Sequence, residues 1–264
     1  MSALTGTGTL LRLAARRDRV LLPSIVAGIA VLVIGSAQAT LALYHDPSRL
    51  QTDVSGIASN PAFLAMYGPL VTPPTVDSFA VFKTLMMGAV FLGIAAYALV
   101  RRHTRTEEEE GRLELVGAGV VGRRAPLTAA VLTALAMVTL TCLVDLAGML
   151  ALGMDPTGTL AFAVSWFGFG AVMTAVTAVA AQITTTARGC GAIALGTLGL
   201  SFLLRAVGDA VDGAGLAAWI SPLGWVQKIQ PYGANRFWVV VIPLVAFVLL
   251  IGLALALLER RDLG

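Results

Sequence analysis

Long apolar runs separated by shorter polar segments dominate the pattern of this sequence. Each of six runs holds about 20 residues or more, the helical length that crosses a hydrocarbon core of about 30 Å. They cover residues 21–43, 79–100, 126–152, 160–183, 189–207 and 237–258. The strands of a membrane barrel would alternate polar and apolar positions, and these runs do not. The backbone N–H and C=O groups must therefore find their hydrogen-bond partners within helices. The pattern predicts an all-α integral membrane protein, with six transmembrane helices in one domain over residues 1–264.

The composition agrees with this prediction. Hydrophobic residues make up 57% of the chain, charged residues 12%, and the mean hydropathy is +0.85. A soluble domain carries about 25% charged residues. The composition argues against a disordered chain and a soluble enzyme, and a net charge of +3 is too small to suggest a nucleic-acid partner. The two cysteines, Cys142 and Cys190, lie in or beside apolar runs and form neither a disulfide framework nor a zinc site.

The basic residues predict the orientation of the chain. With a cytoplasmic N-terminus, thirteen of the 18 Lys and Arg residues lie on the inner side, as the positive-inside rule requires. We therefore expect both termini in the cytoplasm. An alternative interpretation of the first run is a secretory signal, with its cleavage site at Ala37-Gln38-Ala39. The run continues to Leu43, however, and its length suits a span better.

Residues 10–20 have the pattern of an amphipathic helix. Arginines at i, i+4 and i+7 lie on one helical face, and apolar residues lie on another. The residues are Arg12, Arg16 and Arg19, against Leu10, Leu13 and Ala14. Such a helix rests on the lipids of the inner leaflet, although a plain basic flank is the alternative.

Two further segments lie on the predicted outer side. The aromatic residues of segment 208–236, among them Trp219 and Trp225, favour a short helix at the membrane interface. This helix would serve as an anchored loop or as a gate for substrate. Segment 44–78 contains turn signals such as Asn60-Pro61 and no catalytic pattern.

The charged segment 101–124 predicts a helix between the second and third runs. Thr104 or Thr106 can cap it, since each is followed three residues later by a glutamate. Glutamates 107–110 then lie in the first turn, where the helix dipole favours them. Glu108 also forms an i,i+4 pair with Arg112.

This predicted helix carries an apolar stripe. Leu113, Val116 and Val120 recur along one face, and Gly117 and Gly119 are expected to end the helix. One interpretation is a solvated loop whose acids balance its arginines. A stripe that faced only water would have no function, so we favour a docking surface for another protein.

Three charged residues lie within apolar runs at similar depth. They are Lys83, Asp145 and Arg205. A lone charge in a membrane costs about 2.5–3.5 kcal/mol even on a lenient scale, so we expect Asp145 to pair with Lys83 or Arg205. The pair would be structural, or alternatively a relay for protons or substrate. Arg205 can also reach Asp209 at i+4.

Catalytic chemistry has no basis in the sequence. His45 and His103 fall on opposite sides of the predicted membrane, and no GxxxxGK[ST] phosphate loop occurs. We expect no catalytic residue, no metal site and no cofactor in this chain.

Five stretches resemble one family over nearly the whole chain: RHTRTEEEEGRLELV, AAQITTTARG, FLLRAVGD, SPLGWVQKIQP and ERRDLG. The family is the type-2 permease subunits of ATP-binding-cassette exporters, in particular actinobacterial exporters of polyketide antibiotics and other drugs. The resemblance implies a multi-pass protein of the bacterial plasma membrane. It also implies a coupling helix between spans two and three, and a separate ATPase subunit that binds ATP and magnesium.

The resemblance assigns the coupling pattern to particular residues. Its glutamates and glycine correspond to Glu107, Glu109, Gly111 and Glu114, and Arg112 replaces the threonine that often follows the glycine. Members of this branch usually join two six-span halves in one chain. We therefore expect this chain to dimerise, to pair with a second permease, or to be a fragment.

The expected function is the permease subunit of an exporter that moves lipophilic drugs or antibiotics. Two alternatives remain open. One is a proton-coupled secondary transporter with Asp145 as its proton site, and the other is a membrane scaffold that transports nothing.

Overall fold

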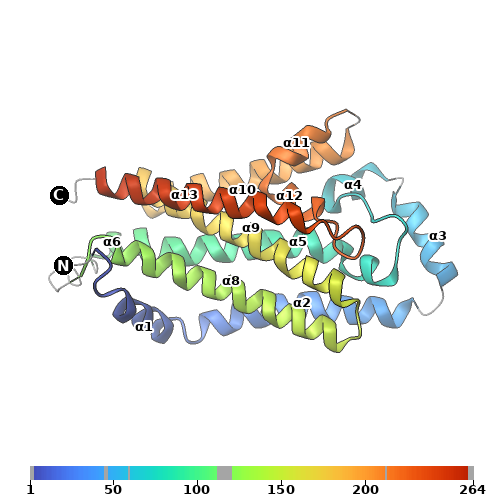
Figure 1. Ribbon diagram of the computed structural model, residues 1–264, viewed down its shortest axis with the longest axis horizontal. Helices are drawn as coiled ribbons and strands as arrows, with labels where there is room; N and C mark the ends of the chain where they lie inside the picture. Colours follow the sequence, from blue (N-terminus) through green and yellow to red (C-terminus); the bar gives the residue numbers. More distant parts are fainter. Residues whose placement is uncertain (1–2, 45–46, 59, 112–120, 212, 261–264) are drawn as a thin grey trace.

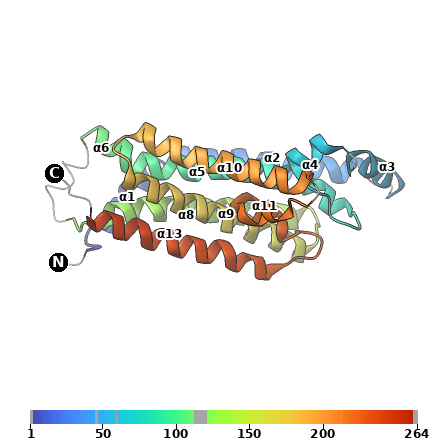
Figure 2. The same ribbon diagram turned by 90° about the horizontal axis from the view of Figure 1, so that it is seen from above.

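Six long helices form the body of the molecule in a computed structural model (Figure 1 and Figure 2). The structure describes residues 3–44, 47–58, 60–111, 121–211 and 213–260. The long helices are α2 (Leu21–Leu43), α5 (Val76–Arg101), α8 (Ala125–Ala151), α9 (Pro156–Ile183), α10 (Ala187–Ala210) and α13 (Val241–Arg260), the last preceded by the 3-10 turn η2 (Phe237–Val240). All six have the length and hydropathy of membrane spans. The described residues contain no strand, so the all-α, six-span prediction is confirmed.

Polar side chains fix the starts of three of these helices. Thr75 and Ser78 form a capping box at α5, in which each hydroxyl accepts a hydrogen bond from the other residue's backbone N–H. Asp155 and Thr186 cap α9 and α10 by accepting from the backbone three residues further on. These caps place the starts a few residues before the predicted span limits.

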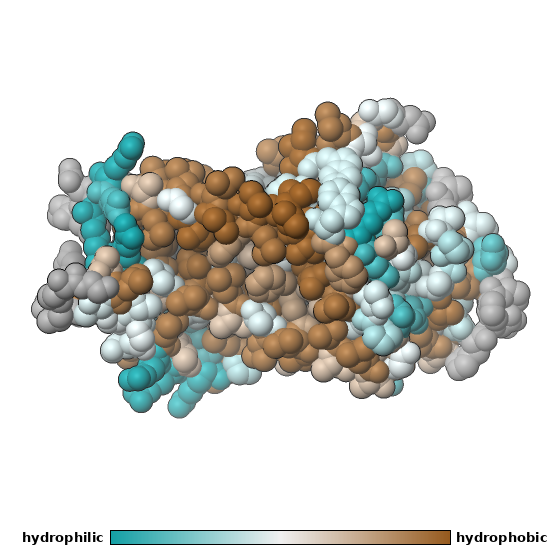
Figure 3. All heavy atoms as spheres, viewed as in Figure 1, coloured by the Kyte–Doolittle hydropathy of each residue, from teal (hydrophilic) through white to brown (hydrophobic). Residues whose placement is uncertain are grey.

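Helix α9 is the centre of the bundle. Within its most apolar window 78% of the residues are buried, against 17% for α13 and 28% for α2. The peripheral helices instead expose large apolar side chains, such as Val31 and Val248. Figure 3 shows the resulting apolar belt across the middle of the molecule, with polar residues toward its two ends. This is the surface that a lipid bilayer solvates.

A glycine allows α5 and α9 to interlock closely. A Cβ atom on Gly88 of α5 would lie 2.3 Å from the Trp166 ring of α9. The Trp166 indole also donates a hydrogen bond of 3.1 Å to the Leu85 carbonyl. The missing side chain therefore makes room for the largest fully buried residue of the bundle.

Short helices also lie outside the six spans. Among the described residues they include α1 (Thr7–Arg17), α3 (Pro47–Ala58), α4 (Pro61–Tyr67), α11 (Gly215–Ile220) and α12 (Pro222–Lys228). Helix α1 confirms the predicted N-terminal helix, which exposes Arg12 and Arg16 and buries Ala14. Segment 44–78 was expected to contain turns, but it holds two helices. Asn60 caps α4, and Pro61 occupies its first turn, so the predicted turn signal is a helix start.

Both described ends of the chain lie at one end of the bundle (Figure 1). The Arg124 backbone N–H donates to the Ala3 carbonyl, and the Arg124 side chain pairs with Glu259 near the last described residue. We call this the termini end and the opposite one the distal end. An even number of crossings places the two ends together, as predicted.

Candidate coupling site

Helix α5 continues without a break into the predicted coupling segment. The π-helical turn η1 (Arg102–Thr106) and α6 (Glu107–Glu109) extend it at the termini end. The predicted cap at Thr104 or Thr106 is therefore wrong. The Thr104 hydroxyl donates back to the Val100 carbonyl at 2.7 Å, and Thr106 is helical with no side-chain cap. A hydroxyl that bonds to its own preceding turn continues a helix and does not begin one.

Gly111 marks the end of this extended helix. Its φ is 68°, a left-handed conformation that glycine adopts at low cost, and its N–H donates to the Glu108 carbonyl. The helix thus ends before the predicted breaks at Gly117 and Gly119. Those two glycines, together with Arg112, Leu113, Glu114 and Val116, lie outside the described residues.

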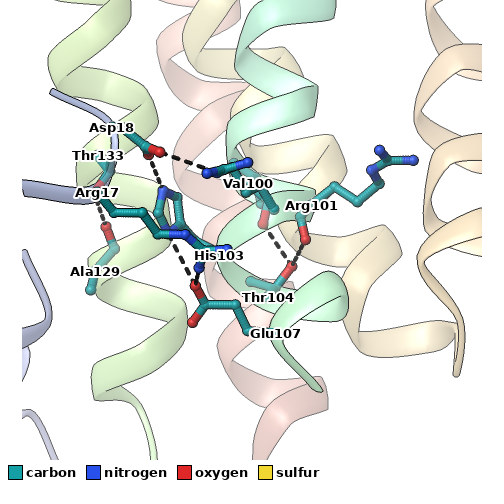
Figure 4. A network of polar contacts seen from close by, with 10 residues as sticks. Arg17, Asp18, Val100, Arg101, His103, Thr104, Glu107, Ala129 and Thr133 are labelled. Carbon is teal, nitrogen blue, oxygen red and sulfur yellow. Dashed lines mark hydrogen bonds and ion pairs between the residues drawn. The ribbon is translucent and has the colours of Figure 1, made fainter. Parts of the chain in front are cut away.

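Asp18, just after α1, is held by two basic residues of η1. Its carboxylate is fully buried. One oxygen accepts a hydrogen bond of 3.1 Å from the Arg102 Nε, and the other lies 2.5 Å from the His103 Nε2 (Figure 4). A buried carboxylate requires such partners, because burial removes its hydration. This contact fastens the N-terminal helix to the end of α5.

Glu107 makes a second bridge between the same elements. Its carboxylate pairs with Arg17, the last residue of α1, and lies 3.7 Å from the His103 Nδ1. Figure 4 shows the His103 ring between the two carboxylates of Asp18 and Glu107. Each ring nitrogen therefore faces an acid, an arrangement that favours the protonated ring.

Arg105 of η1 and Glu109 of α6 connect this end of α5 to α9 and α10. The buried Arg105 donates to the Ala181 carbonyl near the end of α9 and pairs with Glu108. Glu109 accepts a hydrogen bond of 2.7 Å from the Ala187 backbone N–H, at the first residue of α10. A carboxylate at this position accepts from an N–H that has no partner within the helix. The positive end of the helix dipole also stabilises its charge.

We call Asp18, His103, Arg105, Glu107 and Glu109 the α5 hub. It connects the end of α5 to α1, α9 and α10 through hydrogen bonds and ion pairs. The end of α5 is therefore bonded directly to three other helices. Of the predicted coupling residues, Glu107 and Glu109 both bond within this chain.

The three charged residues within the spans do not form the predicted cluster. Arg205 is fully buried and pairs with Asp209, with Nη1 and Oδ2 3.5 Å apart. Its Nη2 donates to the Ala65 and Met66 carbonyls at the end of α4. These contacts and the Asp209 carboxylate are the partners of the guanidinium among the described residues, although its buried Nε and Nη1 have no hydrogen-bond partner there. The predicted pair between Asp145 and Arg205 is therefore wrong.

The alternative partner, Lys83, is exposed at the distal end. Asp145 is fully buried in α8, and neither of its oxygens has a hydrogen-bond partner among the described residues. The prediction paired the two residues because they lie at similar depths in their spans. Lys83, however, is exposed, whereas Asp145 is buried inside the bundle.

The sequence holds one signal for the hub, the single acid Asp18 within the basic stretch 12–19. An isolated acid beside a membrane helix indicates a buried ion pair, but it does not identify the partner. His103 lies 85 positions further along the chain, and the residues around it do not point to Asp18. The contact between them therefore becomes visible only in the folded chain.

Comparison with known proteins yields one extended match. The multidrug efflux system permease protein Rv1217c of Mycobacterium tuberculosis is 39% identical over 267 residues. The match covers 100% of this chain and 47% of the relative. The chain is thus related to multidrug efflux permeases. It spans about half the length of that relative. No protein-family model matches the chain.

This relationship agrees with the expectation from the sequence stretches. Together with the six helices that have the length and hydropathy of membrane spans, it supports a multi-pass protein of the plasma membrane. The match covers the whole chain, so the α5 hub and all six long helices fall within it.

Proposed function

We propose that this chain is the membrane-spanning permease part of an ATP-driven exporter of lipophilic drugs or antibiotics. A separate ATPase subunit binds ATP with magnesium and hydrolyses it. A second permease half, either another copy of this chain or a paired one, completes the pathway. The termini end, with its arginines, faces the cytoplasm, in agreement with the positive-inside rule.

The observation that carries the proposal is the match of the whole of this chain to about half of a multidrug efflux permease, at 39% identity. The α5 hub supports the same conclusion from physical arguments. An ATP-driven permease must receive motion from a subunit outside the membrane, through an element stiff enough to transmit it. The extended α5 meets that requirement, because it continues past the predicted membrane span and is bonded to α1, α9 and α10.

We assign the ATPase contact to the segment that follows the α5 hub, from Gly111 to Val116. Leu113 and Val116 are two apolar residues of the predicted stripe in that segment, and Gly111 and Arg112 lead into it. Glu114 follows within the same segment. Glu107 and Glu109 hold its base to α1 and α10. The ATPase is expected to receive the apolar pair in a groove.

Replacement of Leu113 and Val116 with Asp tests this assignment. The double variant should insert into the membrane normally but fail to co-purify with the ATPase, because buried apolar contact is replaced by charge. Glu110→Gln is the matched control. It removes a charge from an exposed position just before the segment, and it should bind as the wild type does. A double variant that binds the ATPase at wild-type levels contradicts the assignment.

A proton-coupled transporter remains the second candidate. The fully buried Asp145, which has no hydrogen-bond partner among the described residues, favours it, since intramembrane carboxylates often serve proton transfer. Asp145→Asn distinguishes the two. It should abolish proton-coupled export but leave ATP-driven export largely intact.

A further inference from the structure

A pocket of about 450 Å³ opens at the distal end of the bundle, where α2, α3 and α5 meet. Each helix contributes one face to it. The residues used below are Ser36, Thr40 and Tyr44 from α2 and its end, Asp53 from α3, and Phe79 and Lys83 from α5. Its volume is in the range that holds small ligands. Neither the proposed function nor the relative's name assigns a role to this pocket.

Lys83 supplies the positive charge of the pocket. The side chain is exposed, and no carboxylate of the described residues lies within ion-pair distance of its ammonium group. Lys83 lies seven residues inside α5, about 10 Å along the helix at 1.5 Å per residue. An unpaired lysine at this depth is costly in a membrane unless an anion or water reaches it.

Asp53 supplies a negative charge nearer the rim. Its carboxylate accepts a hydrogen bond of 2.6 Å from the Tyr44 hydroxyl. This hydrogen bond raises the pKa of Tyr44, so the hydroxyl remains a donor. Asp53 lies on α3 and contacts Tyr44 at the end of α2, whereas Lys83 lies one helical turn further into α5 than Phe79, whose ring packs against Tyr44. The pocket is therefore positive at depth and negative toward water.

A phosphatidylethanolamine headgroup has the matching order of charges. Its phosphate lies next to the acyl chains, and its primary ammonium lies further toward water.

We propose that this pocket binds the headgroup of a phosphatidylethanolamine lipid, with the phosphate on Lys83 and the ammonium on Asp53. The Thr40 hydroxyl already donates its hydrogen to the Ser36 carbonyl, so it cannot also donate to the phosphate. The Ser36 hydroxyl is available for that hydrogen bond. The proposal is independent of the exported cargo and of the ATPase. It concerns a structural or regulatory lipid held at the distal end of α2 and α5.

Lipid binding to the purified chain in detergent tests the proposal. Native mass spectrometry would count bound phosphatidylethanolamine, phosphatidylglycerol or inorganic phosphate, each added separately. We expect the wild type to retain phosphatidylethanolamine in preference to phosphatidylglycerol, because only the former carries an ammonium for Asp53. Inorganic phosphate that displaces the lipid at equal concentration would identify a free-anion site and overturn the proposal.

Three variants assign the contacts. Lys83→Gln should weaken phosphatidylethanolamine binding at least tenfold, and Lys83→Arg should restore it, since charge-assisted hydrogen bonds to phosphate are strong. Asp53→Asn should bind both lipids equally. Lys228→Gln is the matched control, because Lys228 is the other lysine of the chain and lies against Trp219, outside the pocket. Wild-type binding by Lys83→Gln, or an unchanged lipid preference in Asp53→Asn, contradicts the proposal. A thermal melt of each variant shows whether it is folded.

Discussion

At the residue scale, the buried carboxylate of Asp18 carries much of the contact between α1 and α5. Its two oxygens face Arg102 and His103, and no part of the side chain reaches solvent. Removal of this charge would leave two cationic groups without their buried partner. Such a loss costs more than the bond itself contributes, because the buried His103 ring stays desolvated.

Asp18→Asn tests this contact. Asparagine keeps the shape but loses the charge, and we expect destabilisation of about 1.5–3 kcal/mol in a thermal unfolding experiment in detergent. Glu259→Gln is the control, since Glu259 forms an exposed pair with Arg124 at the same end. Exposed pairs contribute about 0–1 kcal/mol. Equal destabilisation by the two variants would show that Asp18 is not a buried anchor.

Arg205 performs the corresponding function at the distal end. It joins α10 to the end of α4 through the Ala65 and Met66 carbonyls, and its guanidinium lies over the Phe202 ring at 4.8 Å. Arg205→Gln should therefore release α4. We expect amide exchange in residues 62–67 to become at least tenfold faster, with α8 unchanged, and Lys228→Gln should have no effect on either. Unchanged exchange in α4 would contradict this assignment.

At the element scale, the contact between α5 and α9 depends on the absence of a side chain at Gly88. The Trp166 ring fills the space where a Cβ would lie, 2.3 Å away. The indole is fully buried and hydrogen-bonded to α5, so it has little freedom to move. Cores that receive an extra methyl group in such a place become strained.

Gly88→Ala should lower the stability by about 1–3 kcal/mol, measured by thermal unfolding in detergent. Gly28→Ala in α2 is the matched control, because nothing lies within 4 Å of its Cβ position. Alanine is the better helix former, so this variant should be neutral or stabilised by up to about 1 kcal/mol. A stable Gly88→Ala variant would show that Trp166 can shift.

The elements differ in how far the sequence could predict them. The six spans could be predicted because 20 apolar residues in a row have few alternatives in a membrane. The α5 extension could not, because Thr104 suits a helix cap and a helix interior equally well. Tertiary partners decided the outcome, since Asp18 and Ala181 hold Arg102, His103 and Arg105 in a continued turn. The helices of segment 44–78 could not be predicted either, because Asn-Pro begins helices as well as turns.

The charged residues show the same limit at the scale of the whole molecule. Depth along the chain suggested that Asp145 meets Lys83 or Arg205, but it carries no information about the direction in which each side chain points. Arg205 found acceptors on α4, a helix that the sequence pattern does not predict. The family resemblance agrees with the similarity to a multidrug efflux permease, whereas the contacts of the hub required the three-dimensional structure.

The whole molecule is a bundle tied together at both ends. The α5 hub joins four helices at the termini end, and Arg205 joins α4 to α10 at the distal end. The proposed exporter must convert motion at one end into opening at the other. We expect the central helices α5 and α9 to carry that motion, because they interlock through Gly88 and Trp166.

Ethidium export from cells tests the proposed ATP-driven transport most directly. The chain would be expressed alone, with its ATP-binding-cassette ATPase, and with an ATPase variant that cannot hydrolyse ATP. We predict export only with the active ATPase, and export that survives collapse of the proton gradient while ATP is maintained. Export by the chain alone, abolished by an uncoupler at constant ATP, would contradict this prediction and identify a proton-driven transporter.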